Sequence, residues 1–521
     1  MTSRRAQTAR CVGLAIGGGV LAFLGFAGFD IWPLAFVAFV PLFAALDLEP
    51  TQRTRRIVLL SWLFGTVGIA GGYYWLVEML GNFSGFPFAL NVLIATVLFV
   101  YLAGQFALFG WLWFRMSERG WNRTLSAVLA YTAAEFVFPN LFPFYYGVSL
   151  HPLPILLQTA DLGGPLLVSG LIVAVNSVLY ETGRALVRRR PLPRVASVAV
   201  AGWLLAALAY GAVRMEQVES WVADAPKKTV GLVQVNMGIF AKRDDPFEGH
   251  RRHLEQSREL ERELGPDLLI WPESAYNFLL PEDVTNVREQ VTGALETPLL
   301  FGGLARRYED GERRLYNTAY LVNEDGTIEG TYDKTYLLAF GEYLPLGETF
   351  PFLYDLSPNT GHFTPGDHVR PLVLDDWRIA TLICYEDILP SFVRQAVREG
   401  DPHLLVNITN DAWFGDTTEP WIHLALAKFR AIEHRKFLLR VTNSGVSAVV
   451  DPAGRTVTHS GVFTRETLDA EVGLLRRWTP YQLLDAWPGW LAVAAVVWLG
   501  FVTSRAPRSS AGRSKNRRRQ K

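Results

Sequence analysis

Cysteine and charge are both scarce in this sequence. Only two of its 521 residues are cysteines, Cys11 and Cys384, and they lie far apart. Two such thiols exclude a disulfide framework, and they are too few for a zinc site built on cysteine. Charged residues make up 19% of the chain and hydrophobic residues 50%, which is an unusually low share of charge for a soluble protein. The composition therefore indicates a membrane protein.

Apolar runs divide the chain into predicted membrane spans. A spanning helix takes about 20 mostly apolar residues. Eight stretches meet or approach this length: residues 11–29, 31–46, 57–77, 88–114, 125–142, 165–180, 195–213 and 483–502. We expect the first to be a retained helix, because it is too rich in glycine and too closely followed by the second for a cleaved signal peptide. The fifth is the weakest. Its Glu135 indicates either an intramembrane functional site or a structural hydrogen bond between helices.

The basic residues predict the orientation of these spans. Lys+Arg and Asp+Glu number 50 each, so the net charge does not indicate a nucleic-acid partner. Arginines precede the first span and gather in every second loop and in the tail 505–521, whereas loops 81–87 and 145–164 hold no Lys or Arg. This positive-inside pattern predicts eight spans with both chain ends in the cytoplasm. Nucleic-acid binding is the alternative for the tail, but its place beside a span favours topology.

The predicted topology divides the chain into four parts. Residues 1–213 form a membrane domain of seven helices, 214–478 an extracytoplasmic domain, 479–504 a last transmembrane helix and 505–521 a basic cytoplasmic tail. Within the extracytoplasmic domain, β-branched or leucine-rich runs predict strands, and helices are expected at 250–264, 284–295, 391–399 and 422–435. Strands that alternate with helices are typical of a layered α/β domain.

Two of the predicted strands end on side chains that can carry chemistry. The run 268–271 is followed by Pro272 and Glu273, and the run 379–383 is followed by Cys384. Strand ends are rigid, and α/β folds often build their sites there. A thiol that attacks an acyl group needs a base, which Glu273 can supply, and a cation such as Lys334 can stabilise the oxyanion. These three residues are a sufficient set for acyl transfer.

The motifs around these residues resemble a known family. Trp271-Pro272-Glu273, Tyr332-Asp333-Lys334 and Cys384-Tyr385-Glu386 resemble, in order and spacing, the Glu–Lys–Cys triad of the nitrilase superfamily. Other segments are similar to its membrane-embedded branch, the apolipoprotein N-acyltransferases. They are Phe29-Asp30-Ile31-Trp32-Pro33-Leu34, Gln158-Thr159-Ala160-Asp161, Phe340-Gly341-Glu342-Tyr343-Leu344-Pro345, Asn410-Asp411-Ala412-Trp413-Phe414-Gly415, Arg430-Ala431-Ile432-Glu433 and Thr442-Asn443-Ser444-Gly445.

The resemblance implies a fold and a reaction. The fold is a polytopic α-helical membrane bundle of about eight spans that carries an α/β nitrilase-like domain with α-β-β-α layers. In the reaction, Cys384 takes a fatty acyl chain from a phospholipid, with phosphatidylethanolamine as the expected donor. The thioester then acylates the N-terminal amine of a diacylglyceryl-cysteine in a lipoprotein. By analogy with the family, Glu273 is the base, Lys334 stabilises the oxyanion, and Glu342 orients Lys334 or helps proton transfer.

The resemblance also implies supporting residues and a location. Tyr385 and Glu386 are expected to shape the pocket, and Asn410, Trp413 and Phe414 to bind substrate. The two aromatic residues could line a lipid entrance together with residues 350–352, and core packing is the alternative for them. No metal or diffusible cofactor is implied. The catalytic domain is expected on the periplasmic side of a bacterial inner membrane.

One segment departs from the family, and other functions stay open. The family carries a tryptophan a few residues after Gln234-Val235-Asn236. This chain has Lys242-Arg243 there, so substrate positioning by this segment is open. The same triad could serve a membrane-anchored amidase or nitrilase, and the domain could also be a degenerate part of a transporter or scaffold. A Cys–His hydrolase would need one of three histidines beside the thiol. These are His403, His423 and His434.

Overall fold

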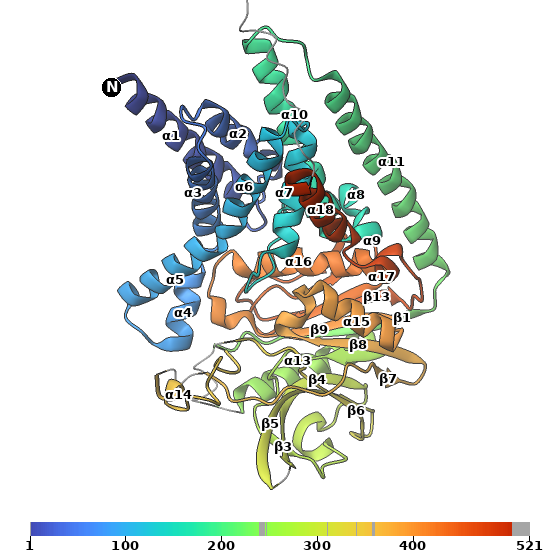
Figure 1. The fold of residues 1–521 in the computed structure, drawn as a ribbon. Helices are drawn as coiled ribbons and strands as arrows, with labels where there is room; N and C mark the ends of the chain where they lie inside the picture. Colours follow the sequence, from blue (N-terminus) through green and yellow to red (C-terminus); the bar gives the residue numbers. More distant parts are fainter. Residues whose placement is uncertain are drawn as a thin grey trace, which may run out of the picture.

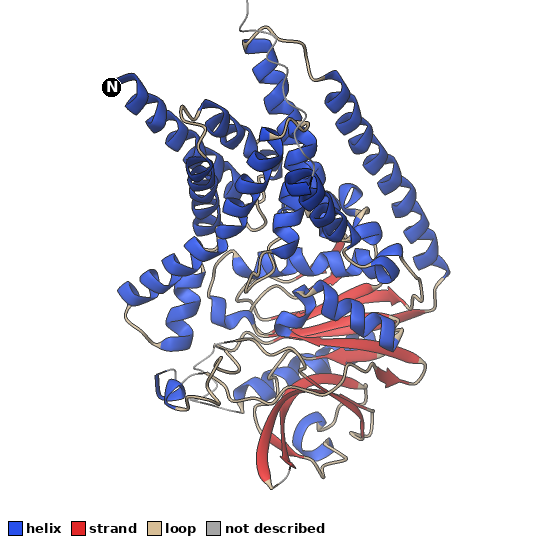
Figure 2. Ribbon diagram, viewed as in Figure 1, coloured by secondary structure: helices blue, strands red, loops and turns tan. Residues whose placement is uncertain are grey.

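The computed structural model describes residues 2–238, 245, 247–309, 311–339, 341–356 and 360–502. The chain has two parts, a helical bundle and an α/β part that contains every described strand (Figures 1 and 2). The predicted departure at Arg243 and the basic tail 505–521 lie outside the described residues.

The helices of the bundle come mainly from the N-terminal part of the chain. In chain order they are α1 (Thr2–Leu24), η1 (Trp32–Phe36), α2 (Phe39–Leu48), α3 (Thr54–Gly72), α4 (Leu76–Ser84), α5 (Phe88–Leu102), α6 (Gly104–Glu118), α7 (Arg123–Val137), η2 (Tyr146–Leu150), α8 (Pro154–Leu157), α9 (Ala160–Gly163), α10 (Pro165–Val187) and α11 (Arg194–Asp224). Small residues let these helices pack closely. A Cβ atom on Gly19 of α1 would lie only 2.6 Å from the carbonyl oxygen of Phe64 in α3.

Four helices of the bundle are long and apolar enough to cross a membrane. They are residues 4–24 of α1, α5 with α6 as residues 88–118, α10 and α11. A fifth span results if α3 and α4 are counted as one helix bent by 61°. The stretches 32–48 and 487–502 are apolar but shorter. The predicted helical membrane region is therefore confirmed with four to five candidate spans, and the count of eight stays a prediction.

Two mixed β-sheets form the centre of the α/β part. The first has the order β13-β1-β2-β4-β5-β6, with β3 beside β4, and the second has the order β12-β11-β10-β9-β8-β7. The strands are β1 (Lys227–Gln234), β2 (Leu268–Ile270), β3 (Leu279–Pro281), β4 (Leu299–Glu309), β5 (Glu312–Val322), β6 (Ile328–Asp333), β7 (Leu372–Leu374), β8 (Trp377–Ile383), β9 (Leu404–Thr409), β10 (Phe437–Thr442), β11 (Ala448–Val450), β12 (Thr456–His459) and β13 (Glu466–Gly473). Parallel pairing joins β1 to β2 and β8 to β9. Strand β2 leads to Glu273 and strand β8 leads to Cys384. Pairing with β1 and β9 therefore fixes the positions of the strand ends that carry these two residues.

The remaining helices cover these sheets. They are α13 (Glu248–Leu264), η3 (Arg288–Thr292), α14 (Phe352–Leu356), η4 (Cys384–Ile388), α15 (Pro390–Gly400), η5 (Asp411–Phe414), α16 (Glu419–His434), α17 (Pro480–Leu484), α18 (Trp487–Val497) and η6 (Trp498–Val502). One apolar core joins the two sheets, through residues such as Leu232 and Ile379. A second core joins the outer face of the first sheet to α13, through Leu260 and Trp271.

Helix α16 connects the α/β part to the bundle. Its residues Leu424, Ala427 and Ala431 belong to the core between the sheets. Its other face, which includes Ile422 and Phe429, belongs to the core of the bundle. Figure 1 shows α16 lying between the bundle and the sheets, and α18 returning the chain into the bundle. The α/β domain is thus packed on the bundle rather than tethered to it.

The helix expected over residues 284–295 is wrong. Only the five residues of η3 are helical there. The preceding residues are tied to the turn between β5 and β6 instead. Asn286 pairs with Thr327, and the backbone N–H of Val287 donates to the carbonyl of Gly326. These tertiary contacts override the local helical pattern.

Candidate active site

Cys384 stands at the carboxyl end of β8, where the strand turns into η4. Its φ of +53° lies in the left-handed region, which is uncommon for a residue with a Cβ atom. Asn407 on the neighbouring strand β9 holds the turn, because its Nδ2 donates to the Cys384 carbonyl at 3.0 Å. Strained backbone of this kind gathers at functional sites.

Glu273 follows β2 and is buried. Strand β4 passes so close to it that a Cβ on Gly302 would lie 2.6 Å from the Cα of Glu273. Only glycine fits at this position. Asn317 on β5 donates its Nδ2 to Glu273 Oε1 at 2.7 Å and to Glu342 Oε1 at 3.0 Å. The carboxylate of Glu273 is therefore fixed from two neighbouring strands.

Lys334 follows β6 and is only 1% exposed. Its Nζ lies 2.7 Å from Glu342 Oε2 and 3.8 Å from Glu273 Oε1. The Glu342 carboxylate also accepts the backbone N–H of Leu338 at 2.8 Å. Burial by itself lowers the pKa of Lys334. The negative charges of Glu342 and Glu273, and that of Cys384 when its thiol is ionised, outweigh burial and raise the pKa above its ordinary value. Lys334 is therefore a fixed cation at neutral pH.

The surroundings of Cys384 favour the neutral form of its thiol, whereas those of Lys334 favour the charged form. Burial raises its pKa, and the nearby carboxylate of Glu273 raises it further, against the opposing effect of Lys334. The Thr409 hydroxyl hydrogen-bonds to the Cys384 side chain and favours the thiolate. Cys384 is thus a neutral thiol at rest, and it must lose its proton to a nearby base when it attacks.

One cavity of about 270 Å³ brings these side chains together. Glu273, Lys334, Glu342 and Cys384 all line it. Its other lining residues are Phe83, Ser274, Asn277, Leu304, Asn317, Leu338, Gly341, Gly361, Phe363, Asn410, Trp413 and Phe414. The sequence prediction thus placed three triad residues and Glu342 around a shared space. Tyr385 and Glu386 do not line it.

Glu386 instead lies behind the cavity and holds two of its walls together. Its carboxylate accepts the Tyr332 hydroxyl at 2.9 Å and the backbone N–H groups of Thr335, Tyr336 and Ile383 at 2.8 to 2.9 Å. These groups flank Lys334 on one side and Cys384 on the other. Burial raises the pKa of Glu386 to about 7, although the hydrogen bonds oppose this rise. Its role in the structure is to set the position of Lys334 relative to the thiol.

Tyr385 joins the site to the bundle. Its hydroxyl donates to the carbonyl of Leu141, and its ring packs edge-on against Phe142, with the centroids 5.9 Å apart. Both partners lie in the segment between α7 and η2. The turn that carries the nucleophile is therefore anchored on the membrane part of the chain.

The predicted substrate residues surround the entrance side of the cavity. The Trp413 ring stacks on Phe83 of α4, with the ring centroids 4.5 Å apart and an angle of 11° between the planes. Phe414 packs edge-on against Trp75 at 5.4 Å. Asn410 accepts the Ala412 N–H at 3.3 Å and the Asn443 amide at 3.1 Å. Trp413 and Phe414 therefore both line the cavity and pack against the bundle.

The three histidines considered for a Cys–His mechanism lie away from this cavity. None of them is among the described residues that line it. His403 Nδ1 accepts the backbone N–H of Arg378 at 3.0 Å, and His423 Nε2 lies 2.7 Å from Asp387 Oδ1. His434 is buried at the end of α16. The geometry gives no support for a Cys–His pair.

One group of described residues could hold a metal ion. Asp411, Glu419 and His423 place one ligand atom each within 4.8 Å of one another. The buried guanidinium of Arg440 already donates to Asp411 Oδ2 at 2.7 Å and to Asp387 Oδ2 at 3.0 Å. Burial and the charge of Asp411 raise the pKa of Glu419 to about 8, so a proton can also neutralise the group. We treat it as a buried charge network below the nucleophile, and the expectation of no metal stays a prediction.

Asn317 is the residue of the site that sequence reasoning missed. It lies just before the apolar run 319–322 that indicated a strand, and a single Asn there carries no pattern. Asn277 lines the cavity, whereas the Tyr276 ring packs in the core behind it. Glu135 in α7 accepts the backbone N–H of Tyr146 at 2.7 Å, which is a structural hydrogen bond.

Comparisons with known proteins fit both parts of the chain. Residues 229–478 match the carbon-nitrogen hydrolase family, and residues 18–178 match the apolipoprotein N-acyltransferase N-terminal domain. The chain is 34% identical to the apolipoprotein N-acyltransferase of Geobacter metallireducens, over 88% of this chain and 89% of that protein. It is 33% identical to that of Azotobacter vinelandii, over 96% of each. Among solved structures, it is similar to Saccharomyces cerevisiae Nit3, a nitrilase superfamily member, with 20% identity, a TM-score of 0.37, and coverage of 47% and 90%.

Proposed function

Because this chain belongs to the apolipoprotein N-acyltransferase family, we propose that the cavity around Cys384 carries out both half-reactions of that activity. The protein transfers a fatty acyl chain from a phospholipid, through a cysteine thioester, to the N-terminal amine of the diacylglyceryl-cysteine of an apolipoprotein. We assign the thioester to Cys384, the base to Glu273 and the oxyanion stabiliser to Lys334.

In the first half-reaction, Cys384 Sγ attacks the ester carbonyl carbon of the phospholipid. Its proton passes to Glu273, and the negative charge that develops on the carbonyl oxygen faces Lys334 Nζ. The ester C–O bond then breaks. Glu273 returns the proton to the leaving alkoxide, so a lysophospholipid departs and the acyl chain stays on Cys384.

In the second half-reaction, the α-amine of the diacylglyceryl-cysteine attacks the thioester carbon. Glu273 takes one proton from the amine, and Lys334 again faces the oxyanion. The C–S bond breaks as the amide forms, and Glu273 gives the proton to Cys384 Sγ. The enzyme returns to its starting state with a neutral thiol and an ionised Glu273.

The observation that carries this proposal is that a neutral thiol, a carboxylate and a fixed cation line the same cavity. The raised pKa of Cys384 creates the need for a base, and Glu273 is the carboxylate that opposes the thiolate. Lys334 cannot serve as the base, because its own pKa is raised. Glu342 holds Lys334 at 2.7 Å and supports its charge.

The position of the cavity supports lipid substrates. Phe83 and Trp413 line its mouth from the bundle and from the α/β domain, and an active site beside the bilayer avoids moving acyl chains into water. That transfer costs about 0.8 kcal/mol per CH₂ group. We infer that Trp413 and Phe414 contact the acyl chain and that Asn410 holds their loop. Phosphatidylethanolamine is the proposed donor, and no cofactor takes part.

The proposed topology rests on the positive-inside pattern of the basic loops. It comprises a seven-helix membrane domain at residues 1–213, the catalytic domain at 214–478, a last span at 479–504 and a cytoplasmic tail at 505–521. The eight spans place the catalytic domain on the periplasmic side of the inner membrane.

Mass spectrometry tests the assignment of the nucleophile. The detergent-purified protein is incubated with phosphatidylethanolamine, and the intact mass and the mass of the Cys384 peptide are measured. We expect an acyl increment on that peptide, released by hydroxylamine and also by a diacylglyceryl-cysteine peptide, which becomes acylated. Cys384→Ala is the matched control and should show no increment.

Two outcomes contradict the proposal. An acyl increment that persists in Cys384→Ala would place the thioester elsewhere. A folded wild-type protein whose Cys384 stays unmodified by phospholipid, but is acylated by a small amide, would instead favour an amidase.

A further inference from the structure

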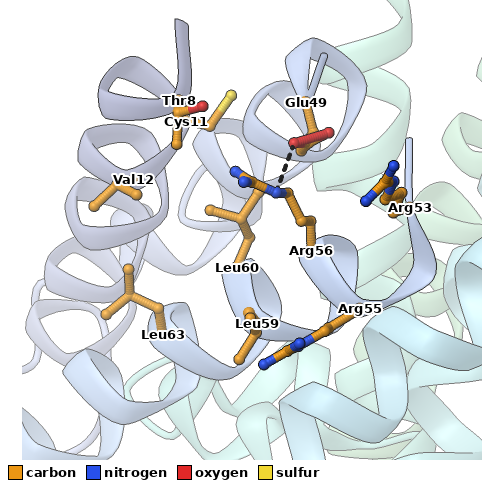
Figure 3. Close-up of a pocket in the computed structure, with 10 residues that line it drawn as sticks. All are labelled: Thr8, Cys11, Val12, Glu49, Arg53, Arg55, Arg56, Leu59, Leu60 and Leu63. Carbon is orange, nitrogen blue, oxygen red and sulfur yellow. Dashed lines mark ion pairs between the residues drawn. The ribbon is translucent and has the colours of Figure 1, made fainter. Parts of the chain in front are cut away.

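A second cavity lies in the bundle, between the N-terminal ends of α1 and α3 (Figure 3). Its volume is about 530 Å³. The residues that line it are Thr8, Cys11, Val12, Glu49, Arg53, Arg55, Arg56, Leu59, Leu60 and Leu63. It is remote from the active site, because the opposite end of α1 meets the catalytic domain, where Gly28 packs on Thr418. Figure 1 shows this end of the bundle facing away from the sheets.

The polar rim of this cavity has an excess of positive charge. Arg53 and Arg55 are exposed, and neither makes an ion pair or a side-chain hydrogen bond within the described part of the chain. Arg56 lies 3.6 Å from Glu49 Oε1 through its Nε. Three arginines against one glutamate leave two positive charges at the first turn of α3, where the helix dipole also favours an anion. The rim therefore suits a phosphate group.

The wall below this rim is apolar. Leu59 and Leu63 of α3 and Val12 of α1 line it, and Leu59 is 47% exposed. Figure 3 shows these aliphatic side chains on the two facing helices, with Arg53 and Arg56 on the side of Glu49 and Arg55 beside Leu59. A ligand that fills both regions needs a charged head and an aliphatic tail. This is the chemistry of a phospholipid.

Glu49 favours a ligand whose head group carries a hydrogen-bond donor. The residue is only 3% exposed. Its Oε2 accepts the backbone N–H groups of Thr51 and Gln52 at 2.5 and 3.0 Å. Its Oε1 lines the cavity and accepts no hydrogen bond in the described residues. A buried carboxylate oxygen without a donor is costly, so the head that fills the cavity should carry one.

We propose that this cavity binds one molecule of phosphatidylglycerol from the leaflet opposite the catalytic domain. The phosphodiester lies against Arg53 and Arg55, a glycerol hydroxyl donates to Glu49 Oε1, and one acyl chain follows Leu59 and Leu63. The excess of two positive charges favours this anionic lipid over a zwitterionic one. The site is separate from the acyl-donor site and goes beyond the acyl-transfer function.

Native mass spectrometry of the full chain in detergent tests the proposal. Phosphatidylglycerol and phosphatidylethanolamine are titrated separately against the wild type, Arg53→Gln/Arg55→Gln and Arg189→Gln/Arg190→Gln. The last pair is the matched control, because both arginines are exposed, follow α10 and lie outside the cavity. We expect about 30-fold weaker binding of phosphatidylglycerol in the first variant, from the loss of two cationic contacts, and no change in the control.

Three results would overturn the proposal. Equal loss of phosphatidylglycerol in both double variants would mean general attraction to the basic face. Displacement of the lipid by inorganic phosphate alone would mean an anion site without a lipid. Equal binding of phosphatidylethanolamine, lost selectively in Glu49→Gln, would mean that an ammonium head occupies the cavity. Thioester formation at Cys384 serves as the folding control, since none of these residues lies in the catalytic cavity.

Discussion

A single amide group joins the two carboxylates of the active site. Asn317 Nδ2 donates to Glu273 and to Glu342, and Glu342 in turn holds Lys334. One neutral residue therefore positions Glu273, the proposed base, and, through Glu342, Lys334, the proposed oxyanion cation. If it were removed, Glu273 would be free to move toward Lys334, 3.8 Å away, and away from the thiol.

We expect Asn317→Ala to lower the rate of thioester formation about 10- to 100-fold. Hydrogen bonds to charged groups contribute about 1.5–3 kcal/mol each, and about 1.4 kcal/mol corresponds to a factor of ten in rate. The measurement is the time course of acyl incorporation into the Cys384 peptide. Asn323→Ala, a half-buried asparagine just after the same strand, is the control. Equal rates in the two variants would rule out a positioning role for Asn317.

A second prediction at the residue scale concerns the pKa of Cys384 in two substituted proteins. Burial and the charge of Glu273 raise this pKa, and Lys334 lowers it. Removing the carboxylate in Glu273→Gln should therefore lower the pH at which iodoacetamide alkylates Cys384, while thioester formation is lost with the base. Lys334→Met should shift the alkylation midpoint in the opposite direction.

Alkylation of the Cys384 peptide is followed by mass spectrometry between pH 7 and 12, because its raised pKa lies above that of an ordinary thiol. Measuring this peptide leaves Cys11 out. The order of the three midpoints is the test. A Glu273→Gln midpoint at or above that of the wild type would show that Glu273 does not face the thiol.

The sequence indicated three residues that the structure brings around one cavity, but not the contacts that hold them there. Glu273 and Cys384 each follow an apolar run, and Lys334 follows the motif Tyr332-Asp333, so short local patterns indicated all three. Asn317 reaches Glu273 only because the register of the β4–β5 pair places it opposite Leu304. Glu386 was predicted to shape the pocket, but three of its four donors, on Tyr332, Thr335 and Tyr336, are 50 to 54 residues away in sequence. Such contacts depend on the folded chain.

At the scale of elements, three helices of the α/β part were the easiest to predict. The helices expected at 250–264, 391–399 and 422–435 correspond to α13, α15 and α16 within a few residues. Strand β13 alternates buried and exposed residues and has no continuous apolar run, so it was missed. The breaks that separate α5 from α6 and α3 from α4 also have no clear signal in the sequence. They depend on packing against neighbouring helices.

Helix α4 contributes a wall of the active site from the membrane side. Phe83 stacks on Trp413, and Asn82 Nδ2 donates to the carbonyl of Trp413 at 2.9 Å. We expect Phe83→Ala to lower kcat/KM for the phospholipid about 3- to 10-fold, mainly through KM. An aromatic pair contributes about 0.5–1.5 kcal/mol beyond the area that it buries.

The effect of Phe83→Ala is measured as the rate of thioester formation at a series of phospholipid concentrations. Phe88→Ala is the matched control, because this neighbouring phenylalanine on α5 is 75% exposed and lies outside the cavity. If Phe83→Ala behaved like the control, or lowered kcat alone, Phe83 would not form part of the lipid entrance.

At the scale of the whole molecule, a buried ion cluster fastens the bundle to the catalytic domain. Asp161 of α9 is fully buried, and its Oδ2 lies 2.6 Å from Arg435 Nη2 and 2.7 Å from Arg214 Nη2. Arg435 follows α16, and Arg214 belongs to α11. The cluster therefore joins α9 and α11 of the bundle to the end of α16. The packing of α16 against both the bundle and the sheets adds to this contact.

Asp161→Asn should lower the free energy of unfolding by about 3–5 kcal/mol, because it leaves the buried guanidinium of Arg435 and the half-buried guanidinium of Arg214 without their carboxylate. Thermal unfolding of the detergent-solubilised protein measures this loss. Asp485→Asn is the control. This aspartate pairs with Arg394 at 3.5 Å and is 39% exposed, so its removal should cost no more than about 1 kcal/mol. If both variants unfolded at the same temperature, the cluster would not join the two parts. The rigid placement of the active site beside the bilayer would then rest on the apolar faces of α16.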